Sequence, residues 1–117
     1  MKIVIQSVHF KASPQLEDFV NKKAAKLFRQ NDRIVRADVT LYKGANGNPR
    51  NEFCEIRLLV PGNDYFVKKN SSTYEESVPD AVQALQKMIR RDKMKKLQKR
   101  RPERANKNLL LKLIRDE

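Results

Sequence analysis

The spacing of apolar residues changes from helical to alternating and back again along this sequence, and that change constrains the fold most. Between Leu16 and Phe28 apolar side chains recur at helical intervals. From Val35 to Tyr42 and from Cys54 to Val60 they alternate with polar ones, which is typical of half-buried strands. Helical spacing returns from Val78 to Ile89. The chain therefore combines helices and strands in a defined order.

Two further segments complete the expected sheet. Residues 2–10 (KIVIQSVHF) and 65–70 (YFVKKN) have strand composition, and the turn sequences GANGNPR and PGND separate the last three strands. Ser13 and Pro14 predict the start of the first helix, because serine caps a free amide and proline fits the first helical position. We expect an α+β fold, a two-layer β-α-β-β-β-α sandwich in which a four-stranded, mostly antiparallel sheet carries both helices on one face.

The start of the second helix has competing signals. Ser72 and Ser77 each stand three residues before an acid, which is the spacing of a capping box. Pro79 would remove a hydrogen bond from a helix that began at Ser72, whereas it fits just after a cap at Ser77. We therefore expect a first turn at residues 73–76 and regular helix from Val78.

Pro102 is expected to end this helix at about Arg101. The chain then consists of a folded domain of residues 1–101 and a partly apolar tail of residues 102–117. The apolar part of the tail runs from Leu109 to Ile114, which is too short to cross a bilayer. The sequence leaves open whether this run is disordered, folds back on the open face of the sheet or binds a protein partner.

Positive charge is concentrated in the second helix. Residues 87–107 contain eleven Lys or Arg residues and two acids, and so supply about nine of the chain's net charge of +12. The apolar stripe stops at Ile89, because Asp92, Lys95 and Lys96 occupy the positions that would continue it. A helix half that is basic and uncovered favours polyanions, which it attracts at long range and binds by releasing their counterions. Nucleic acid is the expected partner.

The sequence gives little support for an enzyme or for a metal-binding protein. His9 is the only histidine, and Cys54 is the only cysteine and stands at an inward strand position, where a small core residue is expected. The sequence contains no glycine-rich phosphate loop, zinc-ligand spacing or nucleophile-base pair. We expect no enzyme activity, cofactor, metal or small-molecule substrate. Without a signal peptide or spanning segment, a cytoplasmic protein is expected.

The aromatic residues favour contacts that do not read base sequence. Of the eight tyrosines and phenylalanines, only Tyr42, Phe66 and Tyr74 are expected to be exposed, because the others stand at core spacing. Stacking platforms for single strands need exposed rings. We therefore expect contacts mainly to phosphate and sugar, with specificity arising from the shape of folded RNA.

Two segments carry a resemblance to a known family. The run from Met1 to Leu16, with Ile3 and Ile5 in the strand and Ser13 as the cap, is one. The other is the stretch from Tyr74 to Lys99, an aromatic residue followed by an amphipathic helix that becomes basic. Together they resemble the ribosome hibernation promoting factors, which include the ribosome-associated translation inhibitor also described as a sigma-54 modulation protein. The similarity lies in element order and pattern.

The resemblance implies a fold similar to the double-stranded-RNA-binding domain with an added first strand. It also implies a non-catalytic factor that binds the decoding region of the small ribosomal subunit, blocks the mRNA and tRNA sites and inhibits translation in idle cells. By position, the cations that would face ribosomal RNA are Lys22, Lys23, Lys26 and Arg29 on the first helix and Lys87, Arg90, Arg91, Lys93, Lys95, Lys96, Lys99 and Arg100 on the second.

The sequence alone leaves other functions open. Long family members have a C-terminal dimerisation domain, and the length of this chain predicts a short form without one. The tail would then bind a ribosomal protein or a second hibernation factor. The charge alone also fits a general structured-RNA- or DNA-binding regulator that acts away from the ribosome. A basic helix followed by a short apolar run resembles a membrane-surface anchor as well.

Overall fold

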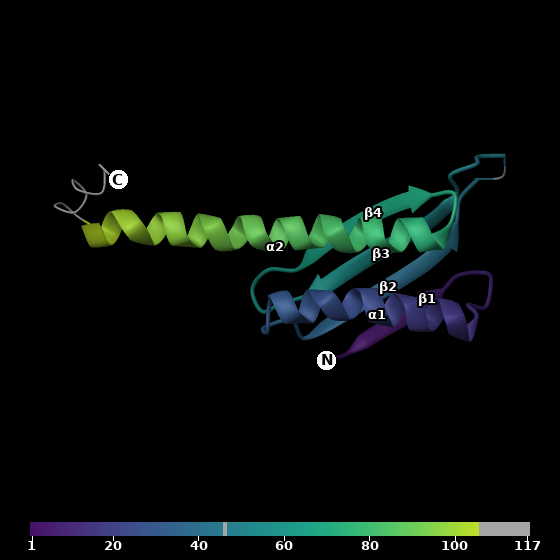
Figure 1. The fold of residues 1–117 in the computed structure, drawn as a ribbon, viewed down its shortest axis with the longest axis horizontal. Coiled ribbons are helices and arrows are strands. Elements are labelled where there is room, and N and C mark those ends of the chain that lie inside the picture. The colour runs from purple at the N-terminus through teal and green to yellow at the C-terminus, as the bar shows by residue number, and fades with distance from the viewer. Residues whose placement is uncertain (46, 106–117) are drawn as a thin grey trace. The chain divides into compact units, whose positions relative to one another are not determined.

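A computed structural model of the chain describes residues 1–45 and 47–105, with side chains described as far as Lys95. The elements follow each other as expected from the sequence (Figure 1): β1 (Ile3–Ser7), α1 (Pro14–Gln30), β2 (Arg36–Lys43), β3 (Glu52–Leu59), β4 (Tyr65–Ser71) and α2 (Tyr74–Ala105). The predicted α+β class and β-α-β-β-β-α order are confirmed. The chain divides within α2 into two units, residues 1–87 and residues 88–117.

The four strands of the first unit form one mixed sheet. Their spatial order is β1-β2-β3-β4, with β1 parallel to β2 and the other pairs antiparallel. Ile5 is opposite Val39, which is opposite Ile56, so these three side chains point to the same face. A parallel pair needs a crossover between its strands, and α1 supplies it. The expected, mostly antiparallel sheet is confirmed.

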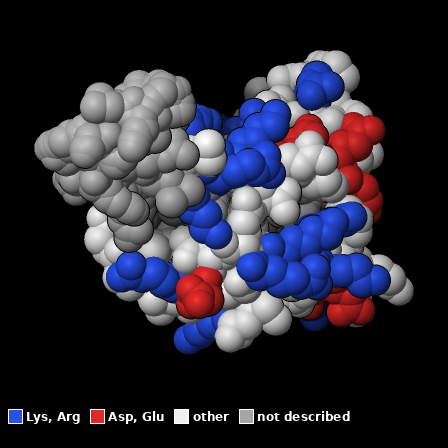
Figure 2. All heavy atoms as spheres, turned by 60° about the vertical axis from the view of Figure 1, so that its left-hand side comes forward, with Lys and Arg blue, Asp and Glu red and all other residues white. Residues whose placement is uncertain are grey.

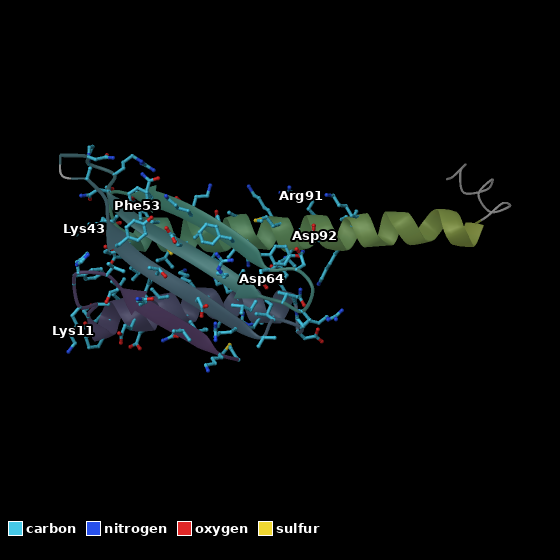
Figure 3. All side chains as sticks on the ribbon, turned by 180° about the vertical axis from the view of Figure 1, so that it is seen from behind. Lys11, Lys43, Phe53, Asp64, Arg91 and Asp92 are labelled. Atoms are coloured by element: carbon cyan, nitrogen blue, oxygen red, sulfur yellow. The ribbon has the colours of Figure 1, made fainter. Side chains whose placement is uncertain are left out.

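The two faces of the sheet differ. One face is covered by α1 and by residues 74–87 of α2, which lie in front of the strands in Figure 1. The buried apolar residues of this layer come from both helices and from the two central strands, β2 and β3: Val20, Ala24, Leu27, Ala37, Val39, Leu41, Cys54, Ile56, Leu58, Val78, Ala81, Val82 and Leu85. Figure 3 shows the sheet from behind, on the face that carries no helix. We call this the open face.

The predicted start of α1 is confirmed. The Ser13 hydroxyl oxygen accepts a hydrogen bond from the amide of Leu16 at 3.1 Å, and Pro14 is the first helical residue. Val20, Ala24 and Leu27 are completely buried, as helical spacing predicts. Because these residues occupy one side of α1, the basic residues between them are turned away from the core.

The predicted start of α2 is wrong in one respect. The helix is continuous from Tyr74 and passes through Pro79 without a break, instead of becoming regular only at Val78. Proline at this position removes only the bond to the carbonyl group of Glu75. Glu75 is exposed, so water can satisfy that carbonyl. The cost of the proline is therefore smaller than in a buried helix.

Neither predicted capping box forms. Ser77 is buried and its hydroxyl group has no partner among the described residues. The amide of Tyr74 instead donates to the Glu52 carboxylate of β3 at 2.8 Å. Glu52 also forms an ion pair with Lys43 at 3.1 Å. The start of α2 is thus fixed by a residue distant in the sequence, which a local capping signal does not reveal.

The other end of α2 also differs from expectation. Pro102 lies inside the helix, which ends at Ala105 rather than at about Arg101. A proline removes only the bond to the residue four positions earlier, so a last turn can follow it. The predicted tail of residues 102–117 therefore begins with helical residues, and residues 106–117 lie outside the described part of the chain.

The ends of two strands also need correction. β1 ends at Ser7 instead of reaching Phe10, because His9 adopts a φ of 65°. This left-handed conformation cannot continue a strand, although histidine tolerates it better than most residues. Val35, expected on the buried face, is 62% exposed and precedes β2.

Candidate nucleic-acid interface

The basic residues of α1 form a stripe on its outer side. Lys22, Lys26 and Arg29 are exposed. Their spacing of four and three residues places them on one side of the helix, over a length of about 10 Å at about 1.5 Å per residue. Lys23 lies beside this stripe and is half-buried, with its ammonium group 5.4 Å from the centre of the Phe19 ring. The structure therefore turns all four predicted α1 cations away from the core.

A hydrogen bond within the first unit joins the end of α1 to α2. The side-chain amide of Gln30 donates to the backbone carbonyl of Gln86 at 3.0 Å. Arg29 and Lys87 are the chain neighbours of these two residues, so the end of the α1 stripe and the first α2 cation lie in the same region. Lys87 is exposed. This junction was not visible in the sequence, because the two glutamines are far apart along the chain.

The second unit contributes the following turns of α2. Arg90, Arg91, Lys93 and Lys95 are exposed. At 100° per residue these positions cover more than half of the helix circumference. Burial ends where the sequence predicts, because Ile89 is 1% exposed whereas Met94 is 53% exposed. Lys96, Lys99 and Arg100 belong to α2, but their side chains lie outside the described part of the chain.

Most of these cations have no acidic partner among the side chains that the structure describes. Two ion pairs in that part of the chain, Arg36 with Asp38 and Lys43 with Glu52, involve strand residues. Lys93 and Asp92 take part in interactions of their own. The remaining described cations of α1 and α2 leave their charge available to an external anion. Figure 2 shows a face on which Lys and Arg side chains gather in several patches.

The described residues hold neither a reactive thiol nor a cluster of metal ligands. Cys54 is completely buried, and burial raises the pKa of its thiol to about 12, so the reactive thiolate does not form at neutral pH. The described residues hold no group of three or more potential metal ligands. Nor do residues 1–45 and 47–105 include a helix with the length and apolar character that a membrane span requires.

The aromatic expectations are partly wrong. Phe66 is 43% exposed and Tyr42 is half-exposed, as expected. Tyr74 is buried, because its ring stacks on Phe10 with 5.4 Å between ring centres. Burial raises the pKa of Tyr74 to about 12, and the nearby Glu52 adds to the rise. The structure adds Phe53, which lies on the open face beside Tyr42. Strict alternation from the buried Cys54 would have predicted that Phe53 lies on the open face.

Comparison with known proteins gives one consistent result. The profile of the Sigma 54 modulation protein / S30EA ribosomal protein family matches residues 3–97. The crystal structure of the Thermus thermophilus Protein Y N-terminal domain has a TM-score of 0.67 and 24% sequence identity, and the match covers 78% of this chain and 98% of that one.

A second solved structure has a similar fold. It is a ribosomal subunit interface protein from Coxiella burnetii, with a TM-score of 0.70 and 17% identity, and the match covers 80% of this chain and 99% of that one. At these identities the two structures establish the fold of residues in the matched region. No curated protein sequence matches the chain.

Proposed function

Because the chain belongs to the Sigma 54 modulation protein / S30EA ribosomal protein family, we propose that it is a ribosome hibernation factor. It binds the decoding region of the small ribosomal subunit through the cations of α1 and α2, blocks the mRNA and tRNA sites and inhibits translation in idle cells. The observation that carries this proposal is the set of exposed cations on two helices of the family's fold, most of which have no acidic partner among the described side chains.

Family membership itself supports the broader part of this statement. The resemblance predicted from the sequence is confirmed, and the family is one of non-catalytic, ribosome-associated proteins. The prediction that the chain is not an enzyme is confirmed with it. Membership implies ribosome-associated modulation of translation. The choice of subunit, the decoding region, the RNA contacts and the action in the cytoplasm are our proposal.

Electrostatics explains how such a factor can bind without reading sequence. The phosphate groups of folded RNA supply dense negative charge, and each lysine or arginine that contacts one releases a condensed counterion. Contacts of this kind fix position and orientation but carry no base information. Specificity for one ribosomal region then comes from the shape of the folded RNA. Cations carried on two separate helices suit an irregular RNA surface better than a uniform duplex.

Sedimentation of lysate from resting cells tests the proposal. The protein should travel with small subunits or intact ribosomes, and an excess of it should inhibit translation of a message in an extract. Recovery of the protein only in the ribosome-free fraction would contradict the proposal. A shortened chain that ends before Pro102, run beside the full chain, tests our further proposal that the tail binds a ribosomal protein or a second factor.

A general RNA- or DNA-binding regulator is the alternative that the same cations favour. Salt does not separate the two, because both depend on counterion release. Competition does separate them. A ribosome factor should keep its preference for small subunits in the presence of excess free duplex RNA, whereas a general binder should be displaced from them.

A further inference from the structure

The open face of the sheet carries a second surface that the helices do not share. Its side chains come from alternate positions of all four strands, and the strand register places them in rows. One row runs from Val4 through Asp38 and Arg57 to Phe66, and it crosses the whole sheet. The covered face holds the core, so the residues of these rows have no role in packing α1 or α2. All of them belong to the first unit.

Aromatic rings occupy two places on this face. Tyr42 and Phe53 are opposite each other on β2 and β3, and their rings stack at 5.1 Å between centres with 5° between planes. Phe66 lies on the edge strand β4 and is 43% exposed. Figure 3 shows Phe53 on the sheet near the turn that follows Lys43. The face thus presents exposed ring surface, which a folded domain normally buries.

The position of the Phe53 ring depends on a glycine. A Cβ atom at Gly44 would lie 2.5 Å from Cε1 of Phe53, which is closer than such atoms approach. Any other residue at this position would push the ring away. Tyr42 is held from its other end, because its hydroxyl group donates to the Glu55 carboxylate at 2.6 Å. Burial and that hydrogen bond raise the pKa of Tyr42 to about 12. The stacked pair is therefore fixed in place.

Cations stand over the rings. The Arg57 guanidinium lies 5.0 Å from the centre of the Phe66 ring, and the Lys68 ammonium lies 5.5 Å from the centre of the Phe53 ring. Neither forms an ion pair within the described residues. Asp38 pairs with Arg36 at 2.8 Å, and Glu55, which lies opposite Lys68, accepts from the Tyr42 hydroxyl group but keeps its negative charge. With the three cations Arg36, Arg57 and Lys68 against these two acids, the rows of the face keep one positive charge in excess.

A hollow of about 430 Å³ lies beside Arg57 and Phe66 and extends to Val4 and Gln6 on the other edge strand, whereas the Tyr42–Phe53 pair and Lys68 lie outside its lining. That volume is within the range of about 300–1,000 Å³ that small-ligand sites occupy. Its floor carries hydrogen-bonding side chains, among them Thr40 and Glu55. A flat ligand with polar edges fits such a hollow, because its faces can stack on a ring while its edges find donors and acceptors.

We propose that the open face binds unpaired bases of single-stranded RNA. The bases stack on Phe66 and on the Tyr42–Phe53 pair, and Arg57 and Lys68 contact the adjoining phosphates. Every base has a face that can stack on a ring, and the backbone supplies the anions that these cations lack. A protein partner is a poorer fit, because the centre of protein interfaces is depleted of charge and the centre of this face holds two arginines and two acids.

This surface is separate from the one assigned to the helices. The α1 cations lie on the layer that covers the sheet, whereas the open face is the other side of the same sheet. The helices would bind folded RNA by its phosphates, and the open face would hold a strand whose bases are not paired. Binding of single-stranded RNA to the open face can therefore be tested without ribosomes, and the result is independent of the function proposed above.

The experiment uses the full chain and a short, unstructured oligouridylate that carries one 2-aminopurine. Stacking on a ring changes the fluorescence of 2-aminopurine, which simple charge attraction does not. Phe66→Leu should keep the fold and lower the affinity about fivefold or more, because stacking on aromatic rings contributes that much per base. Lys68→Gln should lower the salt dependence by about one phosphate contact. Thermal melts followed by circular dichroism verify that both variants fold.

Matched controls sit elsewhere on the molecule. Phe19→Leu removes a ring that also lies beside a lysine, but on α1. Lys11→Gln removes the same charge as Lys68→Gln from an exposed position before α1, seen away from Phe53 in Figure 3. Both controls should bind the oligonucleotide as the unchanged chain does. A variant with Lys22, Lys26 and Arg29 changed to Glu should bind more weakly but still alter the fluorescence at saturating RNA.

Three results would overturn the proposal. The first is an affinity unchanged by Phe66→Leu. The second is an equal loss in Lys68→Gln and Lys11→Gln, which would mean that only net charge matters. The third is a fluorescence change that disappears in the α1 variant at saturation but persists in Phe66→Leu, which would place the bases on the helices. Any of them would leave the open face to a protein partner.

Discussion

At the start of α2 one carboxylate holds two hydroxyl groups. Glu76 accepts hydrogen bonds from Ser71 and from Ser72. The bond from Ser71, and then that from Ser72, lowers the pKa of Glu76 below its ordinary value. A carboxylate in the first turn also complements the helix dipole. The strand end and the helix start are thereby joined through a side chain rather than through the backbone.

The lowered pKa makes this junction sensitive to acid. Because the pKa of Glu76 is lower in the folded than in the unfolded chain, the unfolded chain binds the proton more readily. The stabilisation is complete above the ordinary value of 4.5 and is lost as the pH falls through the lowered pKa. Near neutral pH the junction is at full strength.

We expect Ser71→Ala to raise the pKa of Glu76 toward its ordinary value, because it removes the hydrogen bond with the largest effect. An NMR titration that follows the side-chain carboxyl carbon of Glu76 measures this pKa directly. Ser72→Ala is the matched control and should raise the pKa less. A larger rise in Ser72→Ala than in Ser71→Ala would show that the two hydroxyl groups have been ranked wrongly.

At the scale of the elements, α1 and α2 use proline in opposite ways. Pro14 occupies the first position of α1, where no hydrogen-bond donor is needed. Pro79 lies more than one turn inside α2, where a donor would bind the carbonyl group of Glu75. Proline also restricts the unfolded chain, which offsets part of the loss. The net effect should be destabilising at Pro79 and stabilising at Pro14.

Pro79→Ala should therefore raise the free energy of unfolding by about 1 kcal/mol. A proline inside a helix costs about 3 kcal/mol. The substitution recovers only part of this cost, because it also removes the stiffening of the unfolded chain and some packing. Pro14→Ala should leave it unchanged or lower it by up to about 1 kcal/mol. Urea unfolding followed by circular dichroism measures both. Equal effects of the two substitutions would mean that the missing donor at Pro79 costs nothing.

The elements were predictable to the extent that their signals are local. The cap of α1 needs only Ser13 and its neighbours, and the strands β2 and β3 need only their own alternation. For α2 the sequence predicted a first turn at residues 73–76 but not what holds it, because Glu52, from a different strand, binds its first amide. Tyr74 was placed on the surface because its stacking partner, Phe10, is distant in the sequence. Each failure involves a contact between segments that the chain order does not bring together.

The candidate site also has some features that local sequence predicts and others that depend on packing. Helical spacing alone predicts that Lys22, Lys26 and Arg29 are exposed, and the end of the apolar stripe at Ile89 predicts the exposed cations after it. The bond from Gln30 to Gln86, which brings the end of α1 to the start of the α2 cations, depends on how the helices pack. The open face depends on strand register, which no single strand specifies.

At the scale of the whole molecule, the net charge of +12 is large enough to attract any polyanion. A test of the cations on α1 and α2 must therefore separate the effect of where a charge lies from the effect of the net charge. Reversing four cations to glutamate changes the net charge from +12 to +4 wherever they are located. Two variants that have the same net charge but carry their substitutions at different positions can then be compared directly. Any difference in their binding is due to the positions of the substituted residues.

The first variant carries Lys87→Glu, Arg90→Glu, Arg91→Glu and Lys95→Glu, and it should lose binding to small ribosomal subunits. The control carries Lys2→Glu, Lys11→Glu, Arg33→Glu and Lys69→Glu, all at exposed positions outside the proposed helix surface. We expect the control to bind within a few-fold of the unchanged chain, because it keeps the phosphate contacts and loses only long-range attraction, which salt screens.

Cosedimentation with purified small subunits at two salt concentrations measures both effects. The salt slope of the control should match that of the unchanged chain, whereas any residual binding of the first variant should have a slope lower by about 0.7 for each contact removed. Thermal melts exclude unfolding as the cause. Binding of the first variant at the level of the unchanged chain would show that α2 is not the RNA surface, and an equal loss in both variants would reduce its role to net charge.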